Sequence, residues 1–154
     1  MSTHAGILIH AVFSTKLRFK LLSEVWRDEL YAYMGGTIRG HRGDLLSAGG
    51  VEDHVHLFMR IHPSYAISDT MKLIKANSSR WINENRKIGA KFEWQRGYGA
   101  FSVSQSMASK VDRYICDQKR HHATKSFVDE YLELLRAHEI EFDPQYVFDQ
   151  EIAG

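Results

Sequence analysis

Residues 49–60 read GGVEDHVHLFMR, and this stretch decides how the rest of the chain is arranged. From Val51 onward the residues alternate in the side-chain period of a β-strand with two different faces. His54 and His56 therefore lie on one face of the predicted strand, and Val55 lies on the other. Imidazole nitrogen is the commonest protein ligand for metal ions, so the pair indicates a metal site. The simpler alternative is two surface histidines on the open face of a half-exposed strand.

The chain has 154 residues, which is the length of one domain with a substantial core. Its 44% hydrophobic and 25% charged residues are typical of a globular protein. We see neither a run of about 20 apolar residues that would span a membrane nor the pattern of a secretory signal. The single cysteine, Cys116, fits a reducing compartment. These features predict one domain over residues 1–154, located in the cytoplasm and without a membrane partner.

The net charge of +1 hides an uneven distribution of charge. Residues 129–154 contain eight acids and one base, whereas residues 1–128 carry 19 bases and 11 acids. An acidic C-terminal tail from about residue 126 thus masks a basic body. A basic body favours a polyanion as partner. On charge alone, an ordinary solvated surface with an acidic end is an equally good interpretation.

The predicted elements alternate along the chain in a recognisable order. Strands are expected at residues 7–13, at 45–49, from Val51 onward, and at the end of residues 92–104; helices are expected after Ser23, after Ser68, over residues 107–122 and after Ser126. This βαββαβ order predicts an α+β fold of the ferredoxin-like type, with an antiparallel sheet, helices on one face and additional C-terminal helices. In such a sheet the first and third strands are central. The histidine pair would then lie in mid-sheet, with its open face available to a C-terminal helix.

The predicted helix over residues 107–122 carries a polar stripe of Tyr114, Gln118 and His121. A tyrosine hydroxyl can attack phosphorus and form a covalent phosphotyrosine. The transfer requires charge stabilisation, which a divalent ion on the phosphate supplies. The alternative for Tyr114 is a core residue, because it borders the apolar side of the same helix.

Two imidazoles from His54 and His56, with one amide oxygen from Gln118, would form an incomplete shell around such an ion. The open positions would take phosphate and water, which suits Mg²⁺ or Mn²⁺, and Mn²⁺ accepts nitrogen ligands more readily. A structural zinc site would need four cysteine or histidine ligands, and the sequence pattern indicates no such set.

Four short motifs follow one another along the chain: His10-x-Val12-Phe13-x-Thr15-Lys16, Asp53-His54-Val55-His56, Trp94-Gln95-x-x-Tyr98 and Tyr114-Ile115-x-x-Gln118-x-x-His121-His122. In order and spacing they resemble the small single-tyrosine HUH transposases, the single-strand transposases of the insertion-sequence 200/605 type. The resemblance runs over about residues 6–148. By this resemblance His54, His56 and Gln118 match the metal ligands of the family, and Tyr114 matches its nucleophile.

The resemblance also implies an activity. Members of the family that this chain resembles are ferredoxin-like dimers that recognise hairpins in single-stranded DNA and cut one strand. The tyrosine keeps the 5′ phosphate, a 3′ hydroxyl is released, and no nucleotide cofactor is consumed. Asp117 departs from the family, where many relatives have asparagine before the glutamine, and the long acidic tail is absent from the shortest members. Candidates for contacts with the DNA backbone, on charge and placement, are Lys16, Lys72, Lys75, Arg80 and Arg113.

Two other functions stay open at this point. One is a domesticated protein that binds DNA hairpins but no longer moves DNA. The other is a metal-dependent phosphoesterase that uses His54 and His56 with water and forms no tyrosine adduct. In the transposase interpretation, Tyr114 could act in its own subunit or in that of its partner.

Overall fold

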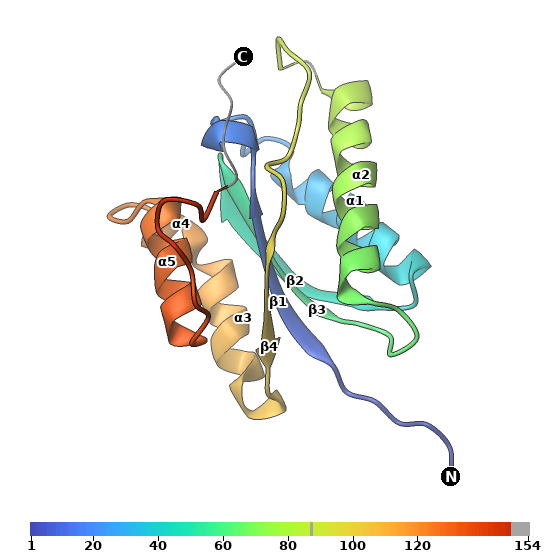
Figure 1. Cartoon of the computed structure of the whole chain (residues 1–154). Coiled ribbons are helices and arrows are strands. Elements are labelled where there is room, and N and C mark those ends of the chain that lie inside the picture. Colours follow the sequence, from blue (N-terminus) through green and yellow to red (C-terminus); the bar gives the residue numbers. More distant parts are fainter. Residues whose placement is uncertain (87, 149–154) are drawn as a thin grey trace.

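A computed structural model of the chain describes residues 1–86 and 88–148. Residues 149–154, the end of the predicted acidic tail, lie outside the described residues, as does residue 87. The elements follow the predicted order (Figure 1): β1 (Leu8–Ser14), a short helix η1 (Lys16–Arg18), α1 (Arg27–Gly40), β2 (Asp44–Val51), β3 (His54–Arg60), α2 (Ile67–Asn85), β4 (Gly99–Val103), a short helix η2 (Gln105–Met107), α3 (Ala108–Cys116), α4 (Gln118–His121) and α5 (Phe127–Ala137).

The four strands form one antiparallel sheet in the order β2-β3-β1-β4, which confirms the ferredoxin-like fold. β1 and β3 are the central pair, with Val12 opposite His56 and Ser14 opposite His54. α1 and α2 cover one face of the sheet, and α3, α4 and α5 lie on the other face (Figure 1). The additional C-terminal helices therefore cover the face that carries the histidine pair.

The hairpin between β2 and β3 turns at Glu52 and Asp53. The predicted start of the histidine strand at Val51 is wrong, because Val51 ends β2 and pairs directly with His54 at the start of β3. The backbone carbonyl of Asp53 accepts a hydrogen bond of 2.8 Å from the backbone N–H of Thr15. The turn is thus attached to the end of β1, which holds the first histidine at a defined place on the sheet.

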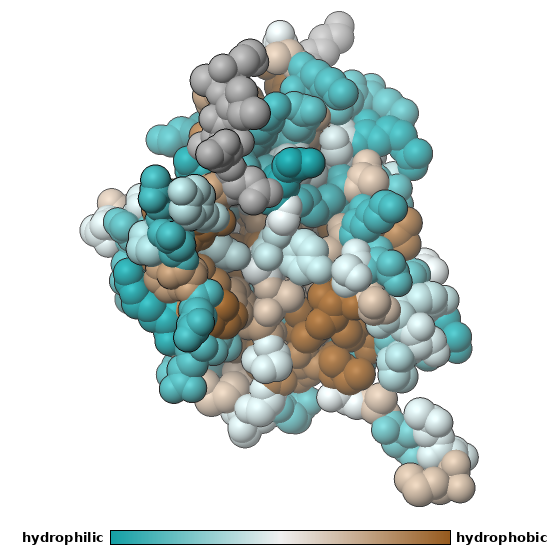
Figure 2. Space-filling view, viewed as in Figure 1, coloured by the Kyte–Doolittle hydropathy of each residue, from teal (hydrophilic) through white to brown (hydrophobic). Residues whose placement is uncertain are grey.

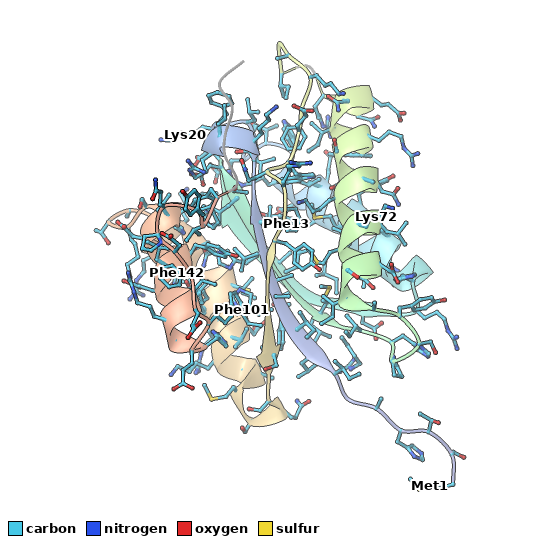
Figure 3. The ribbon with its side chains drawn as sticks, viewed as in Figure 1. Met1, Phe13, Lys20, Lys72, Phe101 and Phe142 are labelled. Carbon is cyan, nitrogen blue, oxygen red and sulfur yellow. The ribbon has the colours of Figure 1, made fainter. Side chains whose placement is uncertain are left out.

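The face under α1 and α2 is apolar. In Figure 3, Phe13 lies on the α2 side of the sheet and Phe101 lies on the α5 side. Alternation along the strands sends every second residue into the core under α1 and α2, where burial of apolar surface is the main source of stability. The strand residues of this core are Ile9, Ala11, Phe13, Val55, Leu57 and Met59.

Three of the predicted helices differ from the structure. α1 begins at Arg27, after a turn that contains Ser23, and α2 begins at Ile67 with Ala66 as its N-cap residue instead of Ser68. The predicted helix over residues 107–122 is broken at Asp117 into α3 and α4. Among the helices of the described residues, only the one that follows Ser126 has a side-chain cap, because the Ser126 hydroxyl accepts a hydrogen bond of 3.2 Å from the backbone N–H three residues later.

α5 is amphipathic and packs on the sheet of its own chain. Phe127 and Leu135 are buried in a second apolar cluster together with Val12 and Phe101. The outer surface of α5 is largely hydrophilic (Figure 2). The predicted acidic tail thus begins as a packed helix. Among the helices of residues 1–86 and 88–148, none combines the length and the apolar character that a membrane span requires.

A glycine allows α3 to lie directly on the edge of the sheet. A Cβ atom added to Gly49 would stand 2.0 Å from the backbone oxygen of Ile115, far inside contact distance. Gly49 pairs with His56 across the sheet. The absence of a side chain at Gly49 therefore brings the helix that carries Tyr114 next to the histidine strand.

Candidate active site

His54 and His56 extend from β3 into the interior, and neither side chain is exposed to solvent. The interpretation of an open, half-exposed strand face is therefore wrong for this chain. Phe127 of α5 stacks on the imidazole of His54, with ring centroids 4.4 Å apart. The two imidazole rings lie 5.1 Å from each other. Buried imidazoles need polar partners, so the groups around them decide what the pair can do.

Gln118 begins α4 and is buried beside the pair. Its Oε1 atom lies 3.2 Å from His54 Nε2 and 3.0 Å from His122 Nε2. Its amide nitrogen donates to the backbone oxygen of Tyr114 at 3.3 Å, which turns the amide oxygen toward the histidines. One chain thus brings together His54, His56 and Gln118, the three predicted ligands.

Tyr114 is half-buried on α3, and its ring centroid lies 5.8 Å from that of His56. Its hydroxyl donates a short hydrogen bond to Oε2 of Glu130 on α5. The other carboxylate oxygen of Glu130 contacts the histidines. The tyrosine hydroxyl and the histidine pair of the same chain are therefore separated by a single carboxylate.

Glu130 lies at the centre of the site with only 2% of its surface exposed. Its Oε1 atom is 2.9 Å from His56 Nε2, 3.0 Å from His122 Nε2 and 3.4 Å from His54 Nε2. A buried carboxylate is stable only where hydrogen bonds and opposite charge replace water. The three imidazoles surround the carboxylate at hydrogen-bond distance or close to it.

The sequence reasoning assigned no role to His122 or Glu130, although a signal for the second was present. Glu130 stands three residues after Phe127 and four before Leu134, which places a carboxylate on the apolar stripe of its helix. Its charge alone places it among the acids of the C-terminal tail. His122 falls at the end of the tyrosine motif, where the backbone after the break at Asp117 turns it inward.

Each of the three imidazoles is also held from its outer side. This arrangement fixes the ring orientation and directs every Nε2 atom toward the centre. The outer contacts join Nδ1 of His54 to Asp53 Oδ1 at 2.7 Å, Nδ1 of His56 to His10 Nε2 at 2.8 Å and Nδ1 of His122 to the Lys125 carbonyl oxygen at 2.7 Å.

Burial and hydrogen bonding separate the protonation states of these groups. Burial lowers the pKa of His56 to about 4, and it lowers that of His10 to about 3. Burial also opposes the charge on His54, but hydrogen bonds to Asp53 and Glu130 outweigh it and raise the pKa of His54 to about 8. Around neutral pH a proton on His54 therefore compensates the carboxylate.

The pKa values of Glu130 and Tyr114 are also shifted. Burial disfavours the carboxylate of Glu130, yet hydrogen bonds from His122, His54 and His56 outweigh this effect and lower its pKa. Burial, assisted by the hydrogen bond to Glu130, raises the pKa of Tyr114. The tyrosine is therefore a neutral hydrogen-bond donor that faces an anionic acceptor.

The described residues bring together four potential metal ligands, one of which is a carboxylate, so the set differs from the cysteine and histidine set of a structural zinc site. The donor atoms of His54, His56, His122 and Glu130 all lie within 4.8 Å of one another. Such a set of three imidazoles and one carboxylate suits a divalent ion, since each residue type is a common ligand. The residues present therefore fit a metal.

The predicted DNA-contacting residues of α2 lie away from this site. Lys72, Lys75 and Arg80 belong to the helix on the opposite face of the sheet, and Figure 3 marks Lys72 on it. The ammonium group of Lys75 donates to the backbone oxygen of Gln95 at 2.6 Å and to that of Gly97 at 2.5 Å. It therefore holds the segment before β4.

The other two residues predicted to contact DNA lie in different parts of the structure. Lys16 is exposed and forms an ion pair of 3.0 Å with Glu93. Arg113 is exposed on α3 and immediately precedes Tyr114 in the chain. Of the five predicted residues, only Arg113 belongs to the helix that carries the tyrosine.

A basic pocket of about 330 Å³ adjoins the histidine cluster. Sequence reasoning missed it because its cations come from three separate segments that meet only in the fold. It is bordered by Asp53 and His122 of the site, and its cations are Lys20, Arg27, Lys119 and Lys125.

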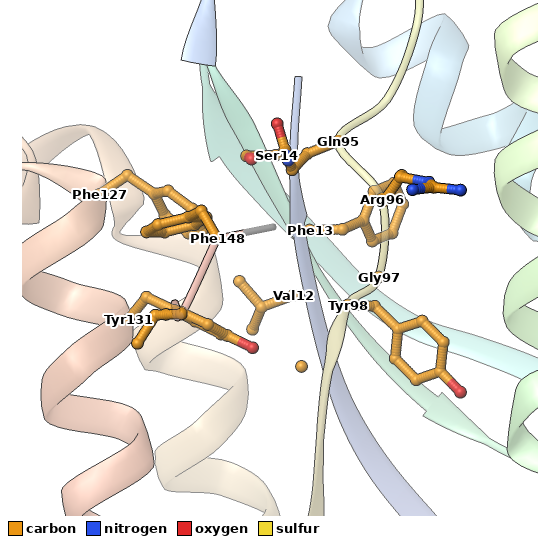
Figure 4. Close-up of a pocket in the computed structure, with 12 residues that line it drawn as sticks. Val12, Phe13, Ser14, Gln95, Arg96, Gly97, Tyr98, Phe127, Tyr131 and Phe148 are labelled. Atoms are coloured by element: carbon orange, nitrogen blue, oxygen red, sulfur yellow. The ribbon is translucent and has the colours of Figure 1, made fainter. Parts of the chain in front are cut away.

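A second, smaller pocket of about 150 Å³ lies on the other side of Phe127. Figure 4 shows Phe127, Tyr131 and Phe148 on one side of this pocket and residues 95–98 on the other, with Val12 between them. The ring of Phe127 therefore separates this aromatic pocket from His54, on which it stacks.

Comparison with known proteins places this arrangement in a family. Residues 3–118 match the family model described as "Transposase IS200 like". The ISDra2 transposase TnpA of Deinococcus radiodurans is 24% identical over 114 residues, which cover 71% of this chain and 81% of the relative.

Two solved structures share the fold. The crystal structure of a candidate transposase from Deinococcus radiodurans R1 aligns with a TM-score of 0.61 and 21% identity, over 75% of this chain and 92% of that chain. A REP-associated tyrosine transposase bound to a REP hairpin aligns with a TM-score of 0.59 and 14% identity, over 97% of this chain and 93% of that chain. Since the family model covers well over half of the sequence, the chain belongs to the IS200-like transposases.

Proposed function

We propose that this chain cuts and rejoins single-stranded DNA through a covalent 5′-phosphotyrosine on Tyr114, with a divalent ion held by His54, His56 and Gln118. One observation carries the proposal: the tyrosine hydroxyl and the Gln118 amide oxygen of a single chain converge on its own histidine pair. Membership of a transposase family supports a DNA-processing enzyme.

The residues of the chain suit each part of this reaction. The bound ion, Mg²⁺ or Mn²⁺, would polarise the scissile phosphate. The Tyr114 oxygen attacks phosphorus, the bond to the 3′ oxygen breaks, and that oxygen leaves as a 3′ hydroxyl with a proton. Glu130 Oε2 accepts the hydrogen bond of the tyrosine hydroxyl, so it can take up that proton as the tyrosine oxygen attacks and pass it on to the departing 3′ oxygen. Attack of a 3′ hydroxyl on the phosphotyrosine reverses the sequence and rejoins DNA.

The proposed substrate is single-stranded DNA with hairpin ends. A solved relative in fold is bound to a REP hairpin, and the basic pocket beside His122 offers cations for a phosphate backbone. Arg113 and Lys16 remain proposed contacts. We assign Lys72, Lys75 and Arg80 only to DNA that passes along α2, remote from the cut.

We further propose that residues 1–154 act as one transposase domain within a homodimer. The domain proposal is supported by the packing of α5 on the same sheet as the other elements. The dimer rests on the family resemblance, and sedimentation velocity tests it. Since a single chain brings Tyr114 to its own histidines, we propose that the tyrosine acts in its own subunit.

The test is an adduct assay. Purified protein is incubated with Mn²⁺ or Mg²⁺ and end-labelled hairpin DNA, and a protein–DNA adduct that resists denaturation is expected on a gel. Tyr114→Phe should abolish the adduct, whereas Tyr131→Phe, which alters a half-buried tyrosine on α5, should retain it. EDTA should also abolish it.

The outcomes separate the three functions. An adduct formed by the Tyr114→Phe variant would overturn the nucleophile. DNA binding without cleavage would favour a domesticated hairpin-binding protein. Cleavage without an adduct would favour a phosphoesterase that uses water.

A further inference from the structure

We propose that His122 and Glu130 are also ligands, so that the cluster binds one first-row transition-metal ion through five protein donors before DNA arrives. This inference rests on the proposed metal site at His54 and His56 and extends it. It assigns metal ligation to the C-terminal segment, beyond the residues that match the family model.

The spacing of the donor atoms is the first argument. Ligand atoms about 2.1 Å from one ion lie roughly 3.0–3.4 Å from their neighbours in octahedral or tetrahedral arrangements. Glu130 Oε1 lies 2.9 Å from His56 Nε2, 3.0 Å from His122 Nε2 and 3.4 Å from His54 Nε2. Gln118 Oε1 lies 3.2 Å from His54 Nε2 and 3.0 Å from His122 Nε2. These separations are close to those expected for atoms that share an ion.

The contacts on the outer sides of the rings are the second argument. A metal-bound histidine almost always has its other nitrogen held by a carboxylate, a carbonyl or a similar group. Asp53 and the Lys125 carbonyl hold Nδ1 of His54 and of His122, and His10 contacts Nδ1 of His56. His122 is held in the same manner as the two predicted ligands.

The hydrogen-bond inventory around His122 is the third argument. Its Nδ1 faces a carbonyl oxygen, which can only accept, so the proton lies on Nδ1. Its Nε2 atom faces two oxygen atoms, Gln118 Oε1 at 3.0 Å and Glu130 Oε1 at 3.0 Å. A cation bound at this point would receive the Nε2 lone pair and both oxygens, while Nδ1 keeps its hydrogen bond to the carbonyl.

The donor types determine which ion fits. Imidazole nitrogen suits Mn²⁺, Zn²⁺ and related ions, whereas Mg²⁺ prefers oxygen ligands and keeps several waters. Three imidazoles, one carboxylate and one amide oxygen would leave a single position of an octahedron for a phosphate oxygen. The cluster should therefore discriminate strongly against Mg²⁺.

In the test, the DNA-free protein is titrated with Mn²⁺. Calorimetry and the electron paramagnetic resonance signal of free Mn²⁺ both measure how much of the ion binds. We expect one ion per chain and an affinity at least about tenfold above that for Mg²⁺. Glu130→Gln and His122→Ala should each weaken Mn²⁺ binding by at least about tenfold, as loss of a ligand requires. Glu133→Gln, an exposed position on the same helix, should bind as the wild type does.

The variants also separate this inference from the proposed function. If Glu130→Gln and His122→Ala keep wild-type affinity while His54→Ala and His56→Ala lose it, the two extra ligands are wrong and the histidine pair stands. If the wild type binds no Mn²⁺, both fail. If Glu130→Gln binds Mn²⁺ normally and forms the DNA adduct faster, Glu130 occupies the place of the phosphate instead.

A spectroscopic count does not depend on the folding of a variant. Electron spin-echo modulation of the Mn²⁺-loaded wild type reports the number of imidazole nitrogens bound to the ion. Three coupled imidazoles are expected, and two would exclude His122.

Discussion

The two faces of this sheet come from the same strands, yet they are built from different chemistry. Under α1 and α2, residues such as Leu57 and Met59 are fully buried among apolar side chains. Under α3 to α5, the alternate residues His54 and His56 are equally buried, but among a carboxylate, an amide and a hydroxyl. Burial alone thus does not distinguish a core from a site.

The contrast teaches where the chain places stability and where it places chemistry. Apolar packing is tolerant, since any well-fitting side chain contributes, whereas a buried polar network requires every member to have its partner. The face that carries His54 and His56, called the polar face below, is held in position by the apolar one, because Val55 between the two histidines is buried in the apolar core. Each face can therefore be perturbed separately.

The largest loss of stability is expected from the apolar face. Leu57→Ala removes a fully buried side chain between two helices and leaves a cavity, so the free energy of unfolding should fall by about 2–5 kcal/mol. Urea denaturation measures this change. The folded fraction should still bind Mn²⁺ as the wild type does, and a loss of binding would contradict the separation of the two faces.

Acid should act mainly on the polar face. His56 and His10 have folded pKa values of about 4 and about 3, below the unfolded value of 6.5. Their contribution to stability is therefore present above pH 6.5 and is lost as the pH falls through 4.

His54, with a raised pKa of about 8, contributes below pH 6.5 and loses its contribution only as the pH rises through 8. Through His56 alone, the free energy of unfolding should decrease by about 3 kcal/mol as the pH falls from the unfolded pKa to below the folded one. Denaturation in EDTA at pH 7 and at pH 4 measures it, and equal stability at both would contradict the buried neutral imidazoles.

The contact between the sheet and α3 can be altered by one methyl group. In Gly49→Ala the added carbon would meet the Ile115 oxygen at 2.0 Å, so α3 must shift, at a cost of about 1–3 kcal/mol. The shift would move Tyr114 relative to the histidines, and the rate of adduct formation should fall by more than stability alone explains. Gly40→Ala, which meets nothing within 4 Å, is the matched control and should leave the rate unchanged.

A bound metal ion should stabilise the folded protein only through its contacts with the polar face. Mn²⁺ at tenfold its dissociation constant should raise the free energy of unfolding by about 1.4 kcal/mol. Differential scanning fluorimetry would show this as a higher Tm. The increase should persist in Leu57→Ala and disappear in His56→Ala; an increase retained in the second variant would place the ion elsewhere.

The architecture was predictable because it depends on local periodicity. The alternation in residues 49–60 and the order of strands and helices determine the sheet and the position of its central pair. Helix starts were less predictable, because several serines could act as caps. α2 begins after Ala66 instead of Ser68, and the helix that carries the tyrosine is broken at Asp117, which no local pattern in the sequence indicated.

The site was predictable only in part, for a related reason. His54, His56, Tyr114 and Gln118 stand in motifs whose spacing is visible along the chain. The carboxylate of Glu130 reaches them from a helix whose position on the sheet no local pattern specifies. Its charge pointed to a solvated tail, while its place on an apolar stripe indicated burial, and the second signal proved correct.

α5 lies beyond residue 118, where the match to the family model ends. The part of the chain that matches the family model carries the histidine pair, the tyrosine and the glutamine, and the segment after it brings His122 and Glu130 to the same centre. A change confined to the end of the chain would therefore alter the surroundings of His54 and His56 without altering any of the four sequence motifs.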